Sequence, residues 1–125
     1  MTIKLGLTAQ SEVTVDMNNT AIHIGSGSLP VFSTPSLIAL MENAAIKCID
    51  GCFDKTLTTV GIALNIEHVK ASATGEKIIA KATLVNICNR ELLFELEAYD
   101  SKGMVGKGSH KRFLINIEKF MSKLK

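Results

Sequence analysis

The sequence is poor in aromatic residues and has little surplus charge of either sign. Its 125 residues include no tryptophan and one tyrosine, Tyr99, and the formal net charge is only +2. Proteins that bind nucleic acids combine basic surfaces with aromatic side chains on which bases stack. We therefore expect no nucleic-acid partner.

Cysteine is also scarce, and the three cysteines form no recognisable site. Cys48 and Cys52 are four residues apart and Cys88 is remote, so the chain has neither a Cys-x-x-Cys redox pair nor a four-ligand zinc spacing. An odd number of cysteines also argues against a disulfide framework, in agreement with a cytoplasmic protein. We expect buried or unreactive thiols.

Segments that direct a chain into a membrane are missing as well. The longest apolar-rich stretch, residues 37–49, is interrupted by Glu42, Asn43 and Lys47. It is also shorter than the roughly 20 helical residues that cross a bilayer. Residues 1–10 lack the basic start and continuous apolar middle of a secretory signal. These absences predict a cytoplasmic protein with no membrane partner.

No motif for a cofactor or metal ion is present. There is no P-loop, no Gly-x-Gly-x-x-Gly between a strand and a helix, and no Gly-x-Ser-x-Gly. His23, His68 and His110 are scattered and have no acid or thiolate at ligand spacing. We expect neither a cofactor nor a metal ion.

The length and composition are those of one folded domain, which we expect to span residues 1–125. Charge is unevenly distributed along it. Residues 1–101 contain seven Lys and Arg against eleven Asp and Glu, whereas residues 102–125 contain seven against one. The basic C-terminal part is either a solvated tail or a rim that attracts phosphates near a ligand site.

Hydrophobic periodicity predicts an α+β fold. Ser33-Thr34-Pro35 is typical of a helix start and Gly51 of a helix end, which predicts a helix over residues 34–50. Period-two patterns predict strands at about residues 12–16, 60–68, 76–88, 91–99 and 104–117. Because no crossover helices separate the later strands, we expect an antiparallel sheet that wraps around one long central helix.

Glu42 is the first acidic residue to consider as a catalytic group. On a helical wheel with Leu37 at zero, Glu42 falls at about 140°, between Ile49 at about 120° and Ile46 at about 180°. A carboxylate between isoleucines is either a boundary residue that reaches water or a functional group compensated by a partner.

His68 raises the same question on a strand. It shares strand parity with Val60, Ile62, Leu64 and Ile66, which predicts an orientation toward the helix. A buried histidine of this kind is often structural. However, Glu42 and His68 could meet in the interior and form an acid/base pair near neutral pH.

Thr34 has two possible roles. It is suited to cap the helix, and a helix N-terminus can also stabilise a carbonyl oxygen that gains negative charge. Eight helical residues put Thr34 about 12 Å from Glu42, so joint action would need an irregular turn, a substrate between them or a second subunit.

The other two histidines are not expected to be catalytic. His23, in a short strand-like run, is expected to pack in a loop. His110 is expected to be exposed because Phe113 and Ile115 have opposite parity.

Four segments of the chain resemble the hotdog-fold acyl-CoA thioesterases, in particular the fluoroacetyl-coenzyme A thioesterase-like branch. The segments are AIHIGSGSLPV at 21–31, TPSLIALMENAA at 34–45, VGIALNIEH at 60–68 with ATGEK at 73–77, and GKGSHKRF at 106–113. The resemblance implies a sheet wrapped around a central helix and a catalytic set of Thr34, Glu42 and His68. It also implies that Gly61 contributes to the acyl pocket, and that the protein is a homodimer or a tetramer with sites at a subunit interface.

The segment before the helix differs from that branch. Only ten residues, rich in Gly and Ser, separate His23 from Thr34, where the fluoroacetyl enzyme has a longer lid with a phenylalanine. We therefore expect a more open pocket and do not expect fluoroacetate as the natural acyl group.

The predicted function is hydrolysis of a short or small acyl-CoA thioester. Glu42 would activate a water or attack the carbonyl carbon itself, and the sequence leaves both routes open. Lys107, Lys111 and Arg112 on the basic C-terminal strand could attract the coenzyme A phosphates. The alternatives are a non-catalytic module that binds acyl-CoA or another small ligand, and a structural protein that self-associates.

Overall fold

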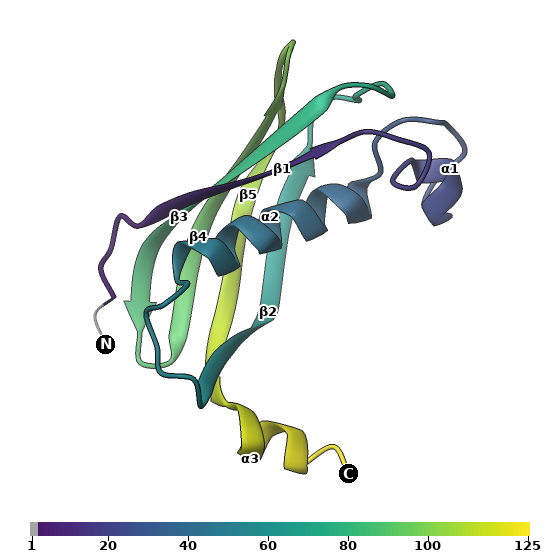
Figure 1. Cartoon of the computed structure of the whole chain (residues 1–125). Helices are drawn as coiled ribbons and strands as arrows, with labels where there is room; N and C mark the ends of the chain where they lie inside the picture. The colour runs from purple at the N-terminus through teal and green to yellow at the C-terminus, as the bar shows by residue number, and fades with distance from the viewer. Residues whose placement is uncertain (1–2) are drawn as a thin grey trace.

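The computed structural model describes residues 3–125, which form one antiparallel sheet, one long helix and two short helices (Figure 1). The strands are β1 (Thr8–Thr14), β2 (Leu57–His68), β3 (Lys77–Cys88), β4 (Glu91–Asp100) and β5 (Gly103–Asn116). The helices are α1 (Ala21–Ile24), α2 (Thr34–Cys48) and α3 (Ile117–Ser122). The order of strands in the sheet is β1-β3-β4-β5-β2, and the curved sheet wraps around α2 (Figure 1). This arrangement confirms the predicted α+β fold.

The core lies between α2 and the inner face of the sheet. The side chains that α2 buries are those of the predicted apolar arc: Leu37, Leu40, Met41, Ala44, Ala45 and Cys48. The sheet contributes alternate residues of its two central strands: Ile78, Ala80, Ala82, Leu84, Leu92, Phe94, Leu96 and Ala98. Burial raises the pKa of the Cys48 thiol to about 11, so this cysteine is unreactive as expected, whereas Cys88 is exposed. No helix among residues 3–125 is both long enough and apolar enough to span a membrane.

Ser33, not Thr34, caps the N-terminus of α2. Ser33 has an extended backbone, and its hydroxyl accepts a hydrogen bond of 3.1 Å from the backbone N–H of Ser36. Thr34 is therefore the first helical residue, and the expectation that it caps the helix is wrong. Because capping does not require the Thr34 hydroxyl, that group is available to another partner.

A bulge in β2 changes which of its side chains face the helix. The pairing with β5 shifts between Gly61 and Ala63, and an extra residue at a bulge reverses the alternation beyond it. Val60 and Ile62 consequently face away from α2, and Ile62 is 50% exposed. Before the bulge Thr59 and Gly61 face inward, and beyond it Leu64, Ile66 and His68 do. The prediction of one shared face is correct for His68 but wrong for Val60 and Ile62.

Strand β5 keeps its alternation past the bulge, because Gly61 pairs with Arg112 and Leu64 with His110, and these two β5 residues both face inward. His110 is only 2% exposed, and Phe113 on the outer face is partly exposed. The prediction that His110 is exposed is therefore wrong, because it took the apolar residues of this strand as the inward ones.

Residues 20–25 also differ from expectation, since they form the short helix α1 rather than a strand-like run. The Thr20 hydroxyl accepts a hydrogen bond from the His23 N–H, and Gly25, with φ at 87°, ends the helix. His23 is exposed on this helix and does not pack in a loop.

Strands β2 and β5 approach each other closely at Gly108. A Cβ atom there would lie 2.2 Å from the carbonyl oxygen of Asn65 and 2.7 Å from the Cα of Ile66. No side chain fits without displacing β2 from β5. Glycine is required at this position to hold the edge strand in place.

We predict that Gly108→Ala lowers the free energy of unfolding by about 1–3 kcal/mol, because the added methyl group overlaps the backbone of β2. Ser109→Ala, on the opposite face of the same strand, is the control and should change this free energy by no more than about 0.5 kcal/mol. Urea unfolding of both variants measures the difference. Equal stabilities would contradict the close approach.

Candidate active site

Thr34 and His68 meet at the N-terminal end of α2. The Thr34 Oγ1 lies 2.8 Å from the His68 Nδ1, a hydrogen bond between the first residue of the helix and the last residue of β2. This contact is possible because Ser33 caps the helix and because the bulge turns His68 inward. Two of the three expected catalytic residues are thus in direct contact within one chain.

The imidazole of His68 is held from one side and unpartnered on the other. The buried Phe32 packs against it edge to face, with ring centroids 6.5 Å apart. Its Nε2 is buried and has no hydrogen-bond partner among residues 3–125. Burial lowers the pKa of His68, so the ring is neutral at pH 7. A neutral ring with one free nitrogen can exchange a proton with a bound ligand.

A pocket of 260 Å³ opens at this pair. Its lining includes Phe32, Thr34, His68 and Lys70. The Lys70 ammonium group forms an ion pair with Asp100, whose carboxylate also accepts a hydrogen bond of 2.7 Å from Ser72. Burial raises the pKa of Asp100, but these hydrogen bonds outweigh it and hold the pKa at about 2. The cation at the rim of the pocket is therefore already neutralised.

Glu42 has different partners from those expected. Its Oε2 lies 3.3 Å from Arg112 Nη1 and 3.6 Å from His110 Nε2. The carboxylate is 38% exposed, whereas the Arg112 side chain is 7% exposed. No hydrogen bond or ion pair in the described chain joins Glu42 to His68. The predicted contact between them is absent within the subunit, because Glu42 lies over the bulge and His68 over the far end of β2.

Arg112 organises the groups around Glu42. Its Nε donates to the Thr59 hydroxyl at 2.8 Å and its Nη2 to the Thr59 carbonyl at 3.0 Å. Its Nη1 lies 3.0 Å from His110 Nε2 and also donates to Glu42. A buried guanidinium is stable only when its donors are satisfied and its charge is balanced. These contacts satisfy both conditions and hold the Glu42 carboxylate in place.

The contacts of His110 select one tautomer. An arginine can only donate, so Nε2 of His110 accepts the bond from Arg112. The ring proton is then on Nδ1, which donates to the Ala63 carbonyl at 2.9 Å. Burial lowers the pKa of His110, and the charge of Arg112 lowers it further. His110 is accordingly a neutral acceptor.

Gly61 covers the carboxylate of Glu42. A Cβ atom at this position would lie 2.6 Å from Glu42 Oε2 and 3.1 Å from His110 Cε1. Any side chain would therefore displace the carboxylate or fill the space beside it. Gly61 keeps this position at the free edge of β2 open.

The basic residues of β5 do not form the expected phosphate-binding rim. Arg112 is buried and its donors contact Glu42 and Thr59, so this conformation does not support its predicted contact with coenzyme A phosphates. Lys111 is on the outer face, where it forms an ion pair of 3.3 Å with Glu91. Lys107 is paired in register with a glutamate on each neighbouring strand, Glu67 and Glu97.

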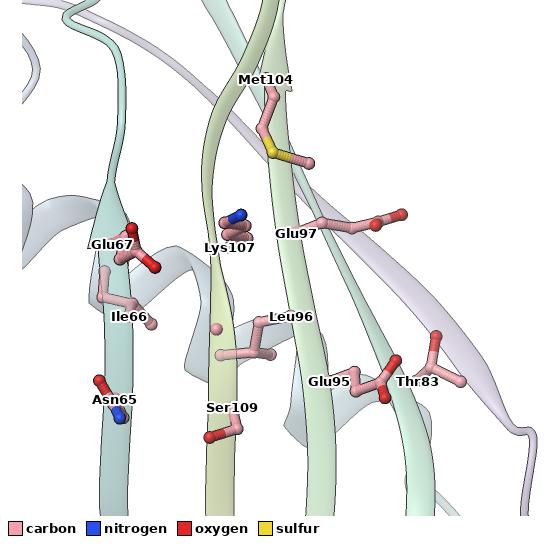
Figure 2. Close-up of a pocket in the computed structure, with 11 residues that line it drawn as sticks. Asn65, Ile66, Glu67, Thr83, Glu95, Leu96, Glu97, Met104, Lys107 and Ser109 are labelled. Carbon is pink, nitrogen blue, oxygen red and sulfur yellow. The ribbon is translucent and has the colours of Figure 1, made fainter.

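A larger hollow, of 660 Å³, lies on the outer face of the sheet. Figure 2 shows the residues that line it on the strands, with α2 behind them. Glu67, Glu95, Glu97 and Lys107 are its charged residues, and none of the expected catalytic residues lines it. No group of three or more His, Cys, Asp or Glu side chains in residues 3–125 is arranged to hold a metal ion. This hollow offers no site for an anionic ligand, because its net charge is negative.

The sequence comparison assigns the chain to a family. The model of the FlK family, fluoroacetyl-CoA-specific thioesterase, matches residues 15–118. The chain belongs to this family. A fluoroacetyl-CoA thioesterase from Streptantibioticus cattleyicolor is 28% identical over 95 residues, which are 76% of this chain and 68% of that protein.

Solved structures of the family and of related proteins share the fold. The fluoroacetyl-CoA thioesterase FlK superposes with a TM-score of 0.93 at 24% identity, over 99% of this chain and 96% of that one. A mutant of FlK in complex with fluoroacetate and CoA gives 0.88 at 25% identity, over 94% and 99%. A thioesterase superfamily member from Thermus thermophilus gives 0.89 at 20% identity, over 98% and 93%. The expected hotdog fold and thioesterase family are confirmed.

Sequence reasoning missed the roles of His110 and Arg112 around Glu42. One signal was available, because Gly106, Gly108, His110 and Arg112 share one parity on the last strand. Two glycines at alternate positions indicate a face against which another element packs closely. That face is the inner one: a Cβ atom at Gly106 would lie 2.9 Å from Leu37 Cδ2 on α2.

We predict that His110 is neutral at pH 7 with its proton on Nδ1, which long-range ¹H–¹⁵N correlation of the imidazole nitrogens measures. Arg112→Met should release this tautomer preference, because the donor to Nε2 is lost, while His23 is unaffected and serves as the internal control. A doubly protonated ring at pH 7, or a proton on Nε2 in the wild type, would refute the assignment.

Folding lowers the pKa of His110. Its contribution to the free energy of unfolding should therefore fall as the pH drops below 6.5, where the unfolded chain binds a proton that the folded one does not.

Proposed function

We propose that this protein hydrolyses a small acyl-CoA thioester and that Thr34, Glu42 and His68 are its catalytic residues. The observation that carries the proposal is the Thr34–His68 hydrogen bond, which leaves the buried Nε2 of His68 without a partner. Family membership supports the reaction class. The CoA found in the FlK complex supports the substrate class.

The chemistry follows from the contacts of each group. Arg112 holds Glu42 through Oε2, so Oε1 can accept a proton from a water that attacks the carbonyl carbon, or can attack that carbon itself. In either route the carbon–sulfur bond breaks and the thiolate needs a proton. When the Thr34 hydroxyl donates to Nδ1 of His68, the ring proton is on Nε2, from which it can reach the sulfur.

Thr34 and Gly61 would position the acyl group. Thr34 is at the positive end of the α2 dipole, where a carbonyl oxygen that gains negative charge is stabilised. Gly61 leaves open the space beside Glu42 that a small acyl group would occupy. Residues 22–30 are exposed, and Ser26 of this segment lines the pocket of Thr34 and His68. The segment is short and rich in Gly and Ser, which supports an acyl group other than fluoroacetyl as the natural one.

A complete site needs a second copy of the chain, because the Thr34–His68 pair and Glu42 are separated by about 12 Å along α2. Strand β2 is an edge strand of 12 residues with neither proline nor lysine, and such an edge is a template for pairing with another chain. If two copies of β2 pair antiparallel about an axis at Asn65, so that Ile66 lies opposite Leu64, His68 of the partner subunit lies opposite the bulge at Gly61 and Ile62. That register brings it to the carboxylate of Glu42 and makes a homodimer with two composite sites.

We predict thiol release from small acyl-CoAs, measured with a thiol-reactive dye over a panel of short straight and branched acyl groups. Glu42→Gln and His68→Ala should each reduce kcat/KM by a factor of about 10²–10⁴, the usual contribution of a general acid or base. Glu97→Gln on the outer face is the matched control. Thermal shifts with acyl-CoA but no release from the wild type would instead favour the non-catalytic binding module.

We further predict that Glu42→Gln and His68→Ala complement each other in mixed dimers. A heterodimer contains one site in which both residues are native, so a refolded equimolar mixture should regain about a quarter of the wild-type kcat. Each variant alone, refolded in the same way, is the control. No recovery, with heterodimers verified by mass spectrometry, would mean that each site is built from a single chain.

A further inference from the structure

A second groove lies on the outer face of the protein, between the start of β2, the end of β5 and helix α3. It has a volume of 350 Å³. Its apolar walls are Val60, Ile62, Phe113, Ile115 and Phe120. The bulge in β2 accounts for this face, because it turns Val60 and Ile62 outward beside Phe113. Helix α3, capped by Asn116, follows β5 directly and supplies Phe120.

The remaining polar lining of the groove is cationic. Arg90, Lys119 and Lys123 line it, with Asn116 as the uncharged polar residue. Within residues 3–125 none of these three cations forms an ion pair, in contrast to Lys70, Lys77 and Lys111. Three unneutralised cations around an apolar floor form a site for an anion that also carries a flat apolar group.

We infer that this groove binds the adenosine 3′,5′-bisphosphate end of coenzyme A. Phe113 and Phe120 would contact the adenine ring, and Arg90, Lys119 and Lys123 would contact the phosphates. The inference rests on the proposed function for the identity of the ligand. Arg90, Lys119 and Lys123 take the phosphate-binding role predicted from the sequence for Lys107, Lys111 and Arg112. Those three residues lie beside glutamates instead.

The position of the groove relative to Glu42 supports this occupant. Val60 and Ile62 flank Gly61, and the inner side of Gly61 covers Glu42. The groove and the carboxylate thus lie on opposite faces of the same short piece of β2. A ligand that occupies both must pass around the free edge of this strand, which requires a long flexible linker such as the pantetheine arm.

The proposed dimer leaves that passage open. With the axis at Asn65, β2 of the partner subunit ends opposite the bulge at Gly61 and Ile62, because each copy of the strand ends at His68. The edge from Leu57 to Val60 therefore extends beyond the paired region. The other outer-face hollow contains Glu67, Glu95 and Glu97 and would repel phosphates.

The test is the double variant Lys119→Glu/Lys123→Glu, which changes exposed side chains and should leave the fold intact by circular dichroism. We expect KM for an acyl-CoA to rise about tenfold or more with kcat unchanged, because two charge-assisted contacts are lost. The N-acetylcysteamine thioester of the same acyl group lacks the nucleotide and should react equally with both proteins. Lys4→Glu/Lys47→Glu, with the same change of charge on exposed residues elsewhere, is the matched control.

A binding measurement separates this inference from the proposed function. Calorimetric titration with adenosine 3′,5′-bisphosphate should show binding to the wild type and at least a tenfold weaker affinity in the double variant, whether or not thioesters are hydrolysed. Equal affinities, or an unchanged KM in a protein that hydrolyses acyl-CoA, would overturn the groove assignment and leave the hydrolase proposal standing. The wild type could instead bind phosphatidylserine vesicles and the double variant not, with both binding the bisphosphate equally. That result would overturn the inference in favour of a membrane surface as the ligand.

Discussion

The bulge between Gly61 and Ala63 is the constraint from which the rest of the functional architecture follows. A strand without it would present one set of alternate residues to the helix along its whole length. With it, β2 directs Val60 and Ile62 outward and His68 inward, and places Gly61 directly over Glu42. One extra residue in the strand thus places His68 on the inner face and the apolar residues Val60 and Ile62 on the outer face.

The charge on Arg112 explains why two further polar residues are buried beside Glu42. A guanidinium removed from water loses several kcal/mol of solvation, which its partners must offset. Thr59 supplies two acceptors, the neutral His110 a third and the Glu42 carboxylate the balancing charge. Glu42 is consequently held by a group that cannot lose its proton at any physiological pH. A carboxylate with one fixed oxygen and one free oxygen is arranged for a directional reaction.

The sequence was sufficient for α2 and the strands, but not for the short helices α1 and α3 or for the faces of the strands. Helix α2 and the strands were predictable because periodicity and turn residues such as Asn89, with φ at 56°, are local signals. The bulge leaves no such signal, so the face of Val60 could not be assigned correctly from alternation alone, whereas the parity that His110 shares with Gly106 and Gly108 was available. The choice between Ser33 and Thr34 as the cap was equally hidden, since both residue types cap helices well. Glu42 and His68 were identifiable because each is a polar residue in an apolar pattern.

The separation of Thr34–His68 from Glu42 gives the exposed edge of β2 a functional explanation. A long, unprotected edge strand is a hazard for a monomer, and natural proteins usually block it with charges, proline or a covering element. Here Gly61 and Ile62 are exposed in the middle of that edge beside Glu42, and the Thr34–His68 pair lies at its end. In the proposed dimer, the end of one β2 strand lies opposite the middle of the other. The symmetry that would cover the edge would therefore also bring each Glu42 to His68 of the partner subunit.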